Sequence, residues 1–253
     1  MKVVGIDFQA AQTERALALA AERGVANVRF EVASVYDLPF PDAAFDAAFA
    51  NTVVQHLAEP HRALREMRLV LKPGGVVGIA DSEHSATVWE PRTPLITAAL
   101  DLFLRVVAHH GGDGHRARHH RRLLLEAGFA RPVATATLGN FGAWGTPEDT
   151  RLIAAWFADQ LRAPAIAALA LAQGWVDQAT LEAMAAEVLA WGERPDAFAV
   201  VMGVAALGWA EATTSPTATS SYPTASGPQH HVVGRRGRPR SWPKKPRLCG
   251  HRA

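Results

Sequence analysis

The chain has 253 residues, of which 49% are hydrophobic and 20% charged, and its formal net charge is +2. This composition is ordinary for a globular protein with a sizeable core, and it excludes a wholly disordered, collagen-like or disulfide-scaffold protein. The single cysteine, Cys249, cannot form an internal disulfide, so nothing in the sequence requires an oxidising compartment.

The first 80 residues alternate between strand-like and helix-like segments. Apolar, strand-like runs are expected at 2–7, 27–33, 45–50 and 76–80, with helices at 10–23 and 59–71. Gly24 suits the C-cap of the first helix, and Pro60 suits the first turn of the second. Lys72-Pro73-Gly74-Gly75 is expected to end that second helix. Because nearly continuous apolar strands alternate with helices, the pattern predicts a parallel sheet covered by helices on both faces, with 45–50 as a buried strand.

The second half of the sequence is more helical. Helices are expected at 94–110, 118–127, from 147 onward and at 178–191, with strands at 132–138 and 198–207. Thr146-Pro147-Glu148-Asp149 is a strong helix start, because an N-cap residue precedes a first-turn proline and two acids. Two helices are expected to fill most of 147–192.

No segment is predicted to cross a membrane. The longest apolar run, 198–210, has 13 residues, which is short of the roughly 20 that a bilayer-spanning helix needs. The amino-terminal MKVVGI is too short for the apolar core of an export signal. We therefore expect a soluble, cytoplasmic protein without a membrane partner.

Residues 212–253 differ sharply from the rest of the chain. They hold eight Lys and Arg and no acid, which leaves residues 1–211 with a net charge of −6. The segment is rich in Ser, Thr, Pro and Gly and has little to bury, so we expect a disordered basic tail after a folded domain at 1–211. A basic arm for nucleic acid is the alternative, and a solvated extension is the preferred interpretation.

Histidines and glycines in the middle of the chain also invite functional interpretation. A GxGxxG-like stretch at 112–117 follows a helix rather than a strand, so we interpret it as a loop without a cofactor role. Five histidines lie nearby among arginines that would repel a cation, and we expect a solvated linker rather than a metal site: His109, His110, His115, His119 and His120. His56 could act as a general base, but we favour a histidine at a helix start that packs and hydrogen-bonds locally.

Four motifs in order carry a family resemblance: GID at 5–7, LPFPDAAFD at 38–46, QHLAEP at 55–60, and LREMRLVLKPGG at 64–75. With this spacing the chain resembles class I S-adenosylmethionine-dependent methyltransferases, and within them the UbiE-like group that acts on small molecules. The resemblance is close over residues 3–83 and extends loosely to about residue 210.

The resemblance implies an α/β fold with a Rossmann-like, doubly wound, mostly parallel sheet and a helical insertion at about 147–192. It places S-adenosyl-L-methionine at the carboxyl ends of the strands. Asp7 would hold the ribose hydroxyls, and Phe8 would lie against the adenine. Ser34 and Val35 would occupy the adenine loop, and Asn51 would lie near the methionine end. No catalytic residue and no metal ligand is assigned.

Two departures from the family pattern affect the functional expectation. The family's first strand and glycine-rich loop are not found ahead of Asp7, which only six residues precede. Ser34 stands where the family usually has an adenine-binding acid, and Asp37 could compensate. We therefore expect methyl transfer to a small-molecule acceptor, impaired by truncation at the amino terminus.

Two other functions stay open. One is a non-catalytic, methyltransferase-like relic that acts as a binding or interaction protein, with exposed sheet edges that could join copies into a homo-oligomer. The other is a nucleic-acid-associated protein that uses the basic tail.

Overall fold

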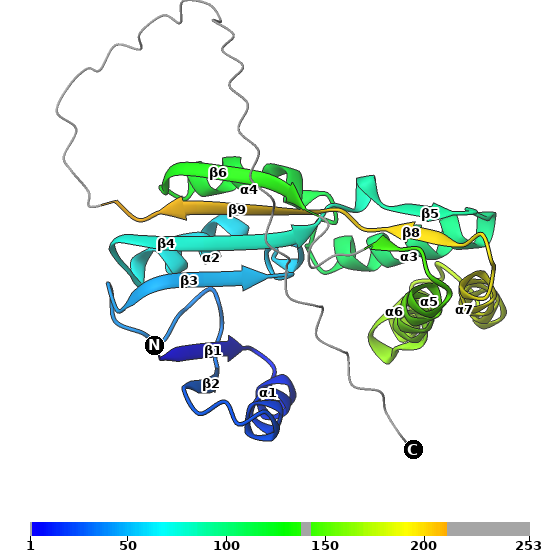
Figure 1. Cartoon of the computed structure of the whole chain (residues 1–253), viewed down its shortest axis with the longest axis horizontal. Helices are drawn as coiled ribbons and strands as arrows, with labels where there is room; N and C mark the ends of the chain where they lie inside the picture. Colours follow the sequence, from blue (N-terminus) through cyan, green and yellow to red (C-terminus); the bar gives the residue numbers. More distant parts are fainter. Residues whose placement is uncertain (1, 138–142, 212–253) are drawn as a thin grey trace, which may run out of the picture. The chain divides into compact units, whose positions relative to one another are not determined.

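The computed structural model describes residues 2–137 and 143–211 (Figure 1). The predicted basic tail at 212–253, including Cys249, lies outside these described residues, and so does the last residue of the strand predicted at 132–138.

A strand–helix–strand unit begins the chain. β1 (Val3–Asp7) and β2 (Val28–Val32) pair in parallel, with Val3 opposite Val28 and Asp7 opposite Val32, and α1 (Ala10–Glu22) connects them. Gly24 has a positive φ of 65°, and its N–H donates to the carbonyl of Ala21. The predicted strands and helix are confirmed here, because alternating apolar runs and a glycine C-cap are strong local signals.

A four-stranded sheet has the order β3-β4-β9-β6. Its strands are β3 (Phe45–Asn51), β4 (Leu71–Ser82), β9 (Gly203–Trp209) and β6 (Ala130–Thr137). β3 runs parallel to β4, whereas β9 lies antiparallel between β4 and β6. α2 (Pro60–Leu69) ends before Leu71, so the Lys72–Gly75 segment belongs to the start of β4 instead of closing the helix as predicted.

A second, smaller sheet has the order β5-β8-β7, formed by β5 (Val88–Glu90), β8 (Phe198–Val200) and β7 (Ala143–Trp144). The single strand predicted at 198–207 is therefore divided into β8 and β9, which belong to different sheets. Between them the carbonyl of Met202 accepts a hydrogen bond from the Glu83 N–H at 2.8 Å. Sequence periodicity cannot show this change of sheet, because both halves are equally apolar.

Four helices pack beside the small sheet: α3 (Pro94–His109), α5 (Pro147–Arg162), α6 (Pro164–Ala172) and α7 (Gln178–Gly192). Three helices, not the predicted two, thus occupy 147–192, because Ala163 is extended (ψ 137°) and Pro164 begins a new helix. Their shared core includes the fully buried Trp191 and Leu161.

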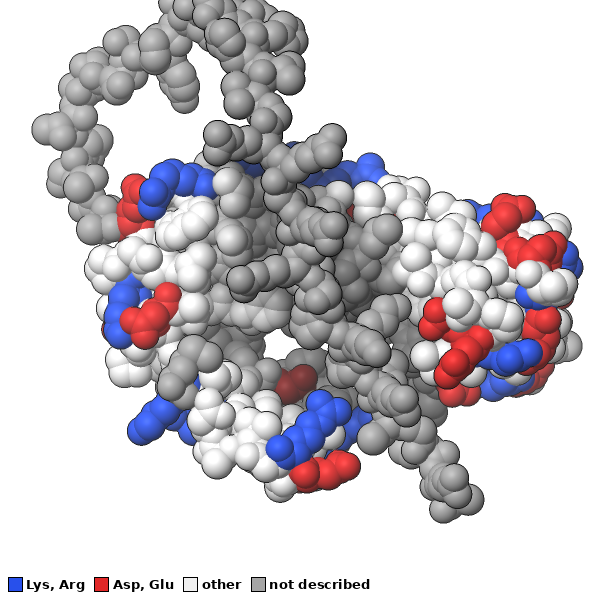
Figure 2. Space-filling view, in the orientation of Figure 1, with Lys and Arg blue, Asp and Glu red and all other residues white. Residues whose placement is uncertain are grey.

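Helices α5 to α7 carry acidic and basic side chains that are interspersed on their surface (Figure 2). Arg151 pairs with Glu193 at 2.8 Å, and Arg162 pairs with Glu182 at 3.0 Å. Within the described part of the chain, no single helix is long and apolar enough to cross a membrane; the bent pair α5–α6 passes that test by length and composition only.

The second core lies between the four-stranded sheet and the helices α2 and α4 (His120–Glu126). Leu64, Ile79 and Leu124 are fully buried there. The periodic Leu64 and Met67 of α2 face this core as their helical spacing predicts.

The predicted Rossmann-like α/β class is confirmed. The sheet was predicted to be mostly parallel, but β1–β2 and β3–β4 are the parallel pairs of the described strands, and the other pairs are antiparallel. Among the described residues, β1 pairs only with β2, and β3 pairs only with β4, so each keeps one open edge. The prediction that 45–50 is a buried strand is wrong for most of its residues. Ala50 is buried, but the Phe49 side chain is 69% exposed, because β3 is an edge strand.

Candidate active site at the carboxyl ends of the strands

Asp7 and Phe8 lie at the carboxyl end of β1. The Asp7 Oδ1 atom accepts a hydrogen bond from the Gln9 N–H at 2.8 Å, while Oδ2 receives none from the described residues. The Phe8 ring is 74% exposed. The Ala33 N–H donates to the Asp7 carbonyl at 3.0 Å, which brings the following residue, Ser34, to the same end of the β1–β2 pair.

Ser34 and Val35 form the turn after β2. The Ser34 Oγ atom accepts a hydrogen bond from the Tyr36 N–H at 3.2 Å, and its carbonyl accepts one from the Asp37 N–H. Ser34 and Asp37 are exposed, whereas Val35 is half-buried and packs against the core beneath the four-stranded sheet. The turn therefore offers a hydroxyl and a carboxyl group to solvent beside Asp7.

Asn51 ends β3, where it lies opposite Ala80 of β4 and is exposed. The next residue, Thr52, has a positive φ of 56°, and its N–H donates to the Ala80 carbonyl at 2.7 Å. Since no ladder joins β3 to β1 in the described residues, the structure brings together Asp7, Phe8 and Ser34 but does not add Asn51 to them.

A glycine-rich segment at 111–118, here called the strap, crosses the carboxyl ends of β3 and β4. The Asp113 N–H donates to the Gln55 carbonyl at 2.7 Å, and the His84 N–H donates to the Gly114 carbonyl at 3.1 Å. A Cβ atom on Gly112 would lie 2.8 Å from the Gln55 carbonyl oxygen. The prediction that the GxGxxG-like stretch is a loop is confirmed, and its glycines permit close packing on the strand ends.

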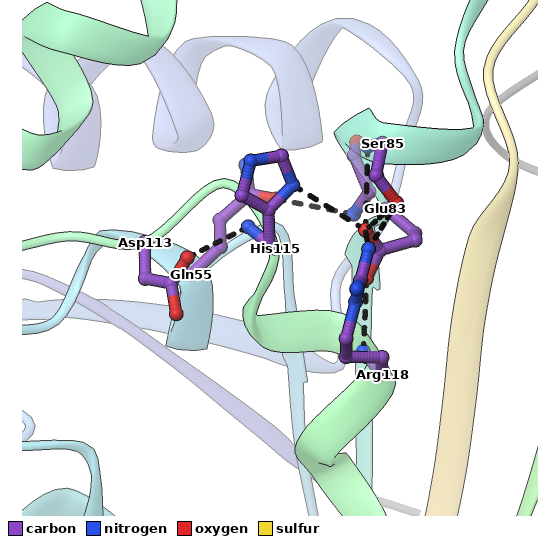
Figure 3. A network of polar contacts seen from close by, with 7 residues as sticks. Gln55, Glu83, Ser85, Asp113, His115 and Arg118 are labelled. Atoms are coloured by element: carbon purple, nitrogen blue, oxygen red, sulfur yellow. Dashed lines mark hydrogen bonds and ion pairs between the residues drawn. The ribbon is translucent and has the colours of Figure 1, made fainter.

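Glu83 anchors the strap to the end of β4 (Figure 3). Its side chain is 3% exposed, and its two oxygens accept hydrogen bonds from the Arg118 guanidinium at 2.7 and 3.1 Å. The Ser85 Oγ donates a further bond at 2.6 Å, and His115 Nδ1 lies 3.5 Å away. Burial tends to raise the pKa of Glu83, but the hydrogen bonds from Arg118 and Ser85 outweigh it and lower that pKa to about 2.

Asp81 and His120 form a buried pair beneath this network. His120 Nε2 lies 2.8 Å from Asp81 Oδ2, and both side chains are 0% exposed. Asp81 Oδ1 and His120 Nδ1 have no hydrogen-bond partner within the described structure. The prediction of a solvated linker at 109–120 is therefore wrong for His120, because η3 (Arg116–His119) turns the chain inward before α4 begins.

Two further histidines follow the strand ends. His56 is exposed and closes the short helix η1 (Val54–His56), with its Nε2 3.0 Å from the Gln55 side-chain nitrogen. His84 is half-buried at the start of η2 (His84–Ala86), 5.6 Å between ring centroids from Phe103. The preferred interpretation of His56 as a histidine at a helix start is wrong in position, because His56 ends η1, while the local hydrogen bonding that it predicted is present in the contact with Gln55.

Sequence reasoning missed Asp81, Glu83 and His84 as members of the site. Their signal was available, because they directly follow an apolar strand in the stretch IADSEH at 79–84. Within the described ranges, no group of three or more His, Cys, Asp or Glu side chains is arranged to hold a metal ion. The described site is thus a cluster of acids and imidazoles.

Comparison with known proteins shows which sequences this chain is similar to. Residues 1–79 match the family described as a methyltransferase domain. The demethylmenaquinone methyltransferase of Clavibacter sepedonicus is 35% identical over 109 residues, which are 42% of this chain and 40% of that protein. An uncharacterised methyltransferase of Bacillus subtilis, YcgJ, is 38% identical over 72 residues, 28% of each chain. Residues 1–79 are thus similar to a methyltransferase domain, and the curated relatives named here are methyltransferases.

Among solved structures, the [4+2]-cyclase SpnF is similar at 25% identity and a TM-score of 0.45, over 84% of this chain and 67% of that one. Phosphoethanolamine N-methyltransferase 2 of Haemonchus contortus has a TM-score of 0.49 at 14% identity, over 84% of this chain and 44% of that one. The chain spans less than half the length of the two curated relatives named above.

Proposed function

We propose that this chain binds S-adenosylmethionine at the carboxyl ends of its strands and transfers the methyl group to a small-molecule acceptor. The proposal rests on Asp7, the last residue of β1. One of its carboxyl oxygens accepts a hydrogen bond from the Gln9 N–H, and the other has no hydrogen-bond partner in the described residues. A carboxyl group at this place in a strand–helix–strand unit suits the two hydroxyls of a ribose. The family match over residues 1–79 supports the same function.

The groups around Asp7 fit an adenosine-bearing cofactor. The exposed Phe8 ring offers a flat apolar surface, and the Ser34 hydroxyl lies at the same end of β2. These three residues would hold the nucleoside part, and Asn51 is proposed near the methionine part. When bound, the cofactor supplies a methyl group made electrophilic by a positively charged sulfur.

The protein would accelerate the reaction mostly by positioning the two reactants. The strap ties the ends of β3 and β4 together through Asp113 and Arg118, so groups on the two strand ends keep a fixed separation. Holding two reactants in line removes much of the entropic cost of a bimolecular displacement. This positioning supports methyl transfer that depends on proximity and orientation.

Calorimetric titration of S-adenosylmethionine into the full 253-residue chain tests the proposal. We expect binding that weakens roughly tenfold or more in Asp7→Ala, since a hydrogen bond to a charged group is worth about 1.5–3 kcal/mol. Asp42→Ala, which removes an exposed acid from the loop before β3, is the matched control and should bind normally. A folded chain that binds no cofactor would refute the proposal.

A second candidate, an interaction role, is supported by the edges of β1 and β3 that pair with no other strand among residues 2–137 and 143–211. Exposed Phe49 and Val32 lie on edge strands, and unpaired strand edges favour pairing with another chain. The proposed partner is a second copy of this chain. Sedimentation of the full chain should then show a dimer that Phe49→Lys shifts toward monomer; a monomer at all concentrations would exclude this role.

A further inference from the structure

The strand–helix–strand unit at 2–33, formed by β1, α1 and β2, carries part of the proposed cofactor site (Figure 1). Asp7 ends β1, Phe8 follows it, and Ser34 comes directly after the unit. Asn51, which is proposed near the methionine part, belongs to the four-stranded sheet instead. The proposed ligand would therefore contact both the unit and the sheet, so the stability of the unit bears on how the ligand binds.

The unit has almost no buried interior. Every residue of β1 and β2 is exposed or half-buried, and Thr13 of α1 is the only buried residue among 2–33. Neither hydrophobic core of the described structure includes a residue of the unit. Six of its apolar side chains are at least 41% exposed: Val3, Phe8, Leu17, Leu19, Val25 and Val32. Since burial of apolar surface is the dominant favourable contribution to folding, the unit by itself gains little stability.

Loose packing between α1 and the two strands adds to this weakness. An open hollow of about 320 Å³ lies between them. Its lining is mainly apolar and comes from both sides: Ala16, Leu19 and Ala20 of α1, and Val3, Val28 and Phe30 of the strands. Side chains that line an unfilled space lose the contacts that dense packing provides. The helix is therefore only weakly held on its strands.

Residues 2–33 also have few local features that could replace a core. The N-cap residue of α1, Gln9, makes no capping hydrogen bond with its side chain, and the first turn of the helix holds no acidic residue. The sequence 2–33 contains no cysteine and no histidine, so it has neither a disulfide nor the usual zinc ligands to close it. Folded units below about 40 residues usually need such a constraint or a partner.

The chain is attached to the rest of the fold immediately after the unit. Val35 and Leu38 pack against the core beneath the four-stranded sheet. The Leu38 N–H donates to Glu66 Oε2 of α2 at 3.3 Å, and the Glu59 N–H donates to the Tyr36 hydroxyl at 3.2 Å. These contacts lie outside the unit, so the unit can unfold while the sheet and α2 stay intact.

We propose that residues 2–33 are mostly unfolded in the free chain and fold when S-adenosylmethionine binds. The inference rests on the proposed cofactor binding. The adenosine part would cover the exposed Phe8 ring and hydrogen-bond to Asp7, which adds contacts that the free unit lacks. Because the ligand would also contact Asn51, it would tie the unit to the sheet. A ligand that binds only the folded form shifts the population toward that form.

This coupling has a measurable consequence for affinity. When the binding-competent form is a small fraction of the free protein, the observed dissociation constant rises by the inverse of that fraction. A substitution that weakens the folded unit then weakens cofactor binding, even where its side chain touches no ligand. A unit that is already folded in the free chain shows no such dependence.

Hydrogen–deuterium exchange of the full chain tests the folding step directly. Without cofactor, we expect the amides of β1 and β2 to exchange at nearly unfolded rates, although the two strands are paired in the folded unit. The amides of Val77 and Ile79 in β4 should exchange far more slowly, because both residues are fully buried. Saturating S-adenosylmethionine should slow exchange throughout 2–33 by roughly tenfold or more and change β4 little.

Two matched alanine-to-glycine variants test the effect on affinity. Ala18 is exposed in the carboxyl-terminal half of α1, and Ala18→Gly lowers the helix propensity there without removing a group of the proposed site. It should weaken S-adenosylmethionine binding about fivefold in a calorimetric titration. Ala155→Gly makes the same change at an exposed position of α5, a helix that contributes to the core around Trp191, and should leave the affinity unchanged.

The outcomes separate the inference from the proposed function. Exchange in 2–33 of the free chain as slow as in β4 would overturn the inference, and so would cofactor binding that leaves this exchange unchanged; the proposed methyl transfer would stand in both cases. An unchanged affinity in Ala18→Gly, or an equal loss in Ala155→Gly, would overturn it as well. No cofactor binding at all would overturn both. Unfolding curves for the two variants verify that the rest of the chain keeps its fold.

Discussion

Arg118 donates three hydrogen bonds to Glu83, two from its guanidinium and one from its backbone N–H, at distances of 2.7 to 3.1 Å. This relationship joins residues 35 positions apart and fixes the strap on the end of β4. Since His84 follows Glu83 directly, the same contact sets where the His84 ring lies. The ion pair is therefore part of the frame of the candidate active site.

Replacing Glu83 with Gln should destabilise the fold and change its acid sensitivity. We expect the free energy of unfolding to fall by about 2 kcal/mol at pH 7, because the Arg118 guanidinium would then face a neutral amide instead of a carboxylate. Arg118 is half-exposed, so water replaces part of the lost interaction. The folded-state pKa of Glu83 is about 2, below the ordinary 4.5, so its stabilisation is complete above pH 4.5 and is lost as the pH falls toward 2.

Urea unfolding at a series of pH values measures this effect. The difference between the native protein and Glu83→Gln should shrink as the pH falls from 4.5 toward 2. Glu59→Gln removes an exposed acid that lies 3.4 Å from Arg62, and it serves as the control with little expected effect. A difference that stays constant over this range would contradict the assignment.

Replacing His120 with Leu should be more costly than any exposed histidine substitution. The change leaves the fully buried Asp81 carboxyl group without its only hydrogen-bond partner in the described residues. Removing one partner of a buried pair typically costs about 3–5 kcal/mol. Thermal or urea unfolding should show this loss, and the double variant Asp81→Leu/His120→Leu should recover part of it. His110→Leu should change stability little.

The close packing of the strap predicts a difference between two glycines of similar backbone conformation. Gly111 and Gly174 have positive φ values of 80° and 63°. A Cβ atom on Gly111 would lie 2.8 Å from the Ala58 Cβ, whereas one on Gly174 would meet nothing within 4 Å. Gly111→Ala should therefore cost about 1–3 kcal/mol more than Gly174→Ala, because of overpacking. Equal unfolding midpoints would show that the strap adjusts freely.

Thr146 should contribute to the stability of α5 as its N-cap. Its Oγ1 accepts a hydrogen bond from the Asp149 N–H at 3.2 Å. Thr146→Ala should cost about 1 kcal/mol, and Thr146→Ser should retain most of the stability, because serine keeps the acceptor oxygen. Chemical denaturation of the two variants side by side measures the difference, and equal losses would argue against a capping role.

Local signals explain which elements could be predicted. Gly24, Pro60 and Thr146 mark helix ends through backbone geometry and hydrogen bonding that depend only on neighbouring residues. Where two packing solutions compete, local signals fail. The apolar run at 198–207 fits one strand equally well as two, and the tertiary pairing with β5 and β4 divides it.

In the candidate site, too, some residues could be placed from local sequence signals and others only from the tertiary structure. Asp7 and Phe8 could be placed at a strand end from the motif GID, and the structure puts them there. No sequence pattern relates Glu83 to Arg118 or Asp81 to His120, because each pair is more than 30 residues apart and depends on how the strap folds over β4. The histidines at 115 and 120 look alike in sequence, yet one is exposed and the other fully buried.

By itself, the sequence determined the α/β alternation, the helix boundaries with caps and the family resemblance of residues 3–83, since these arise from short-range periodicity and motif order. Only the tertiary structure decided that β9 runs antiparallel between β4 and β6, and that acids and imidazoles gather at one edge of the sheet. Those features depend on contacts between distant segments, where burial and charge pairing decide between arrangements that are locally equivalent.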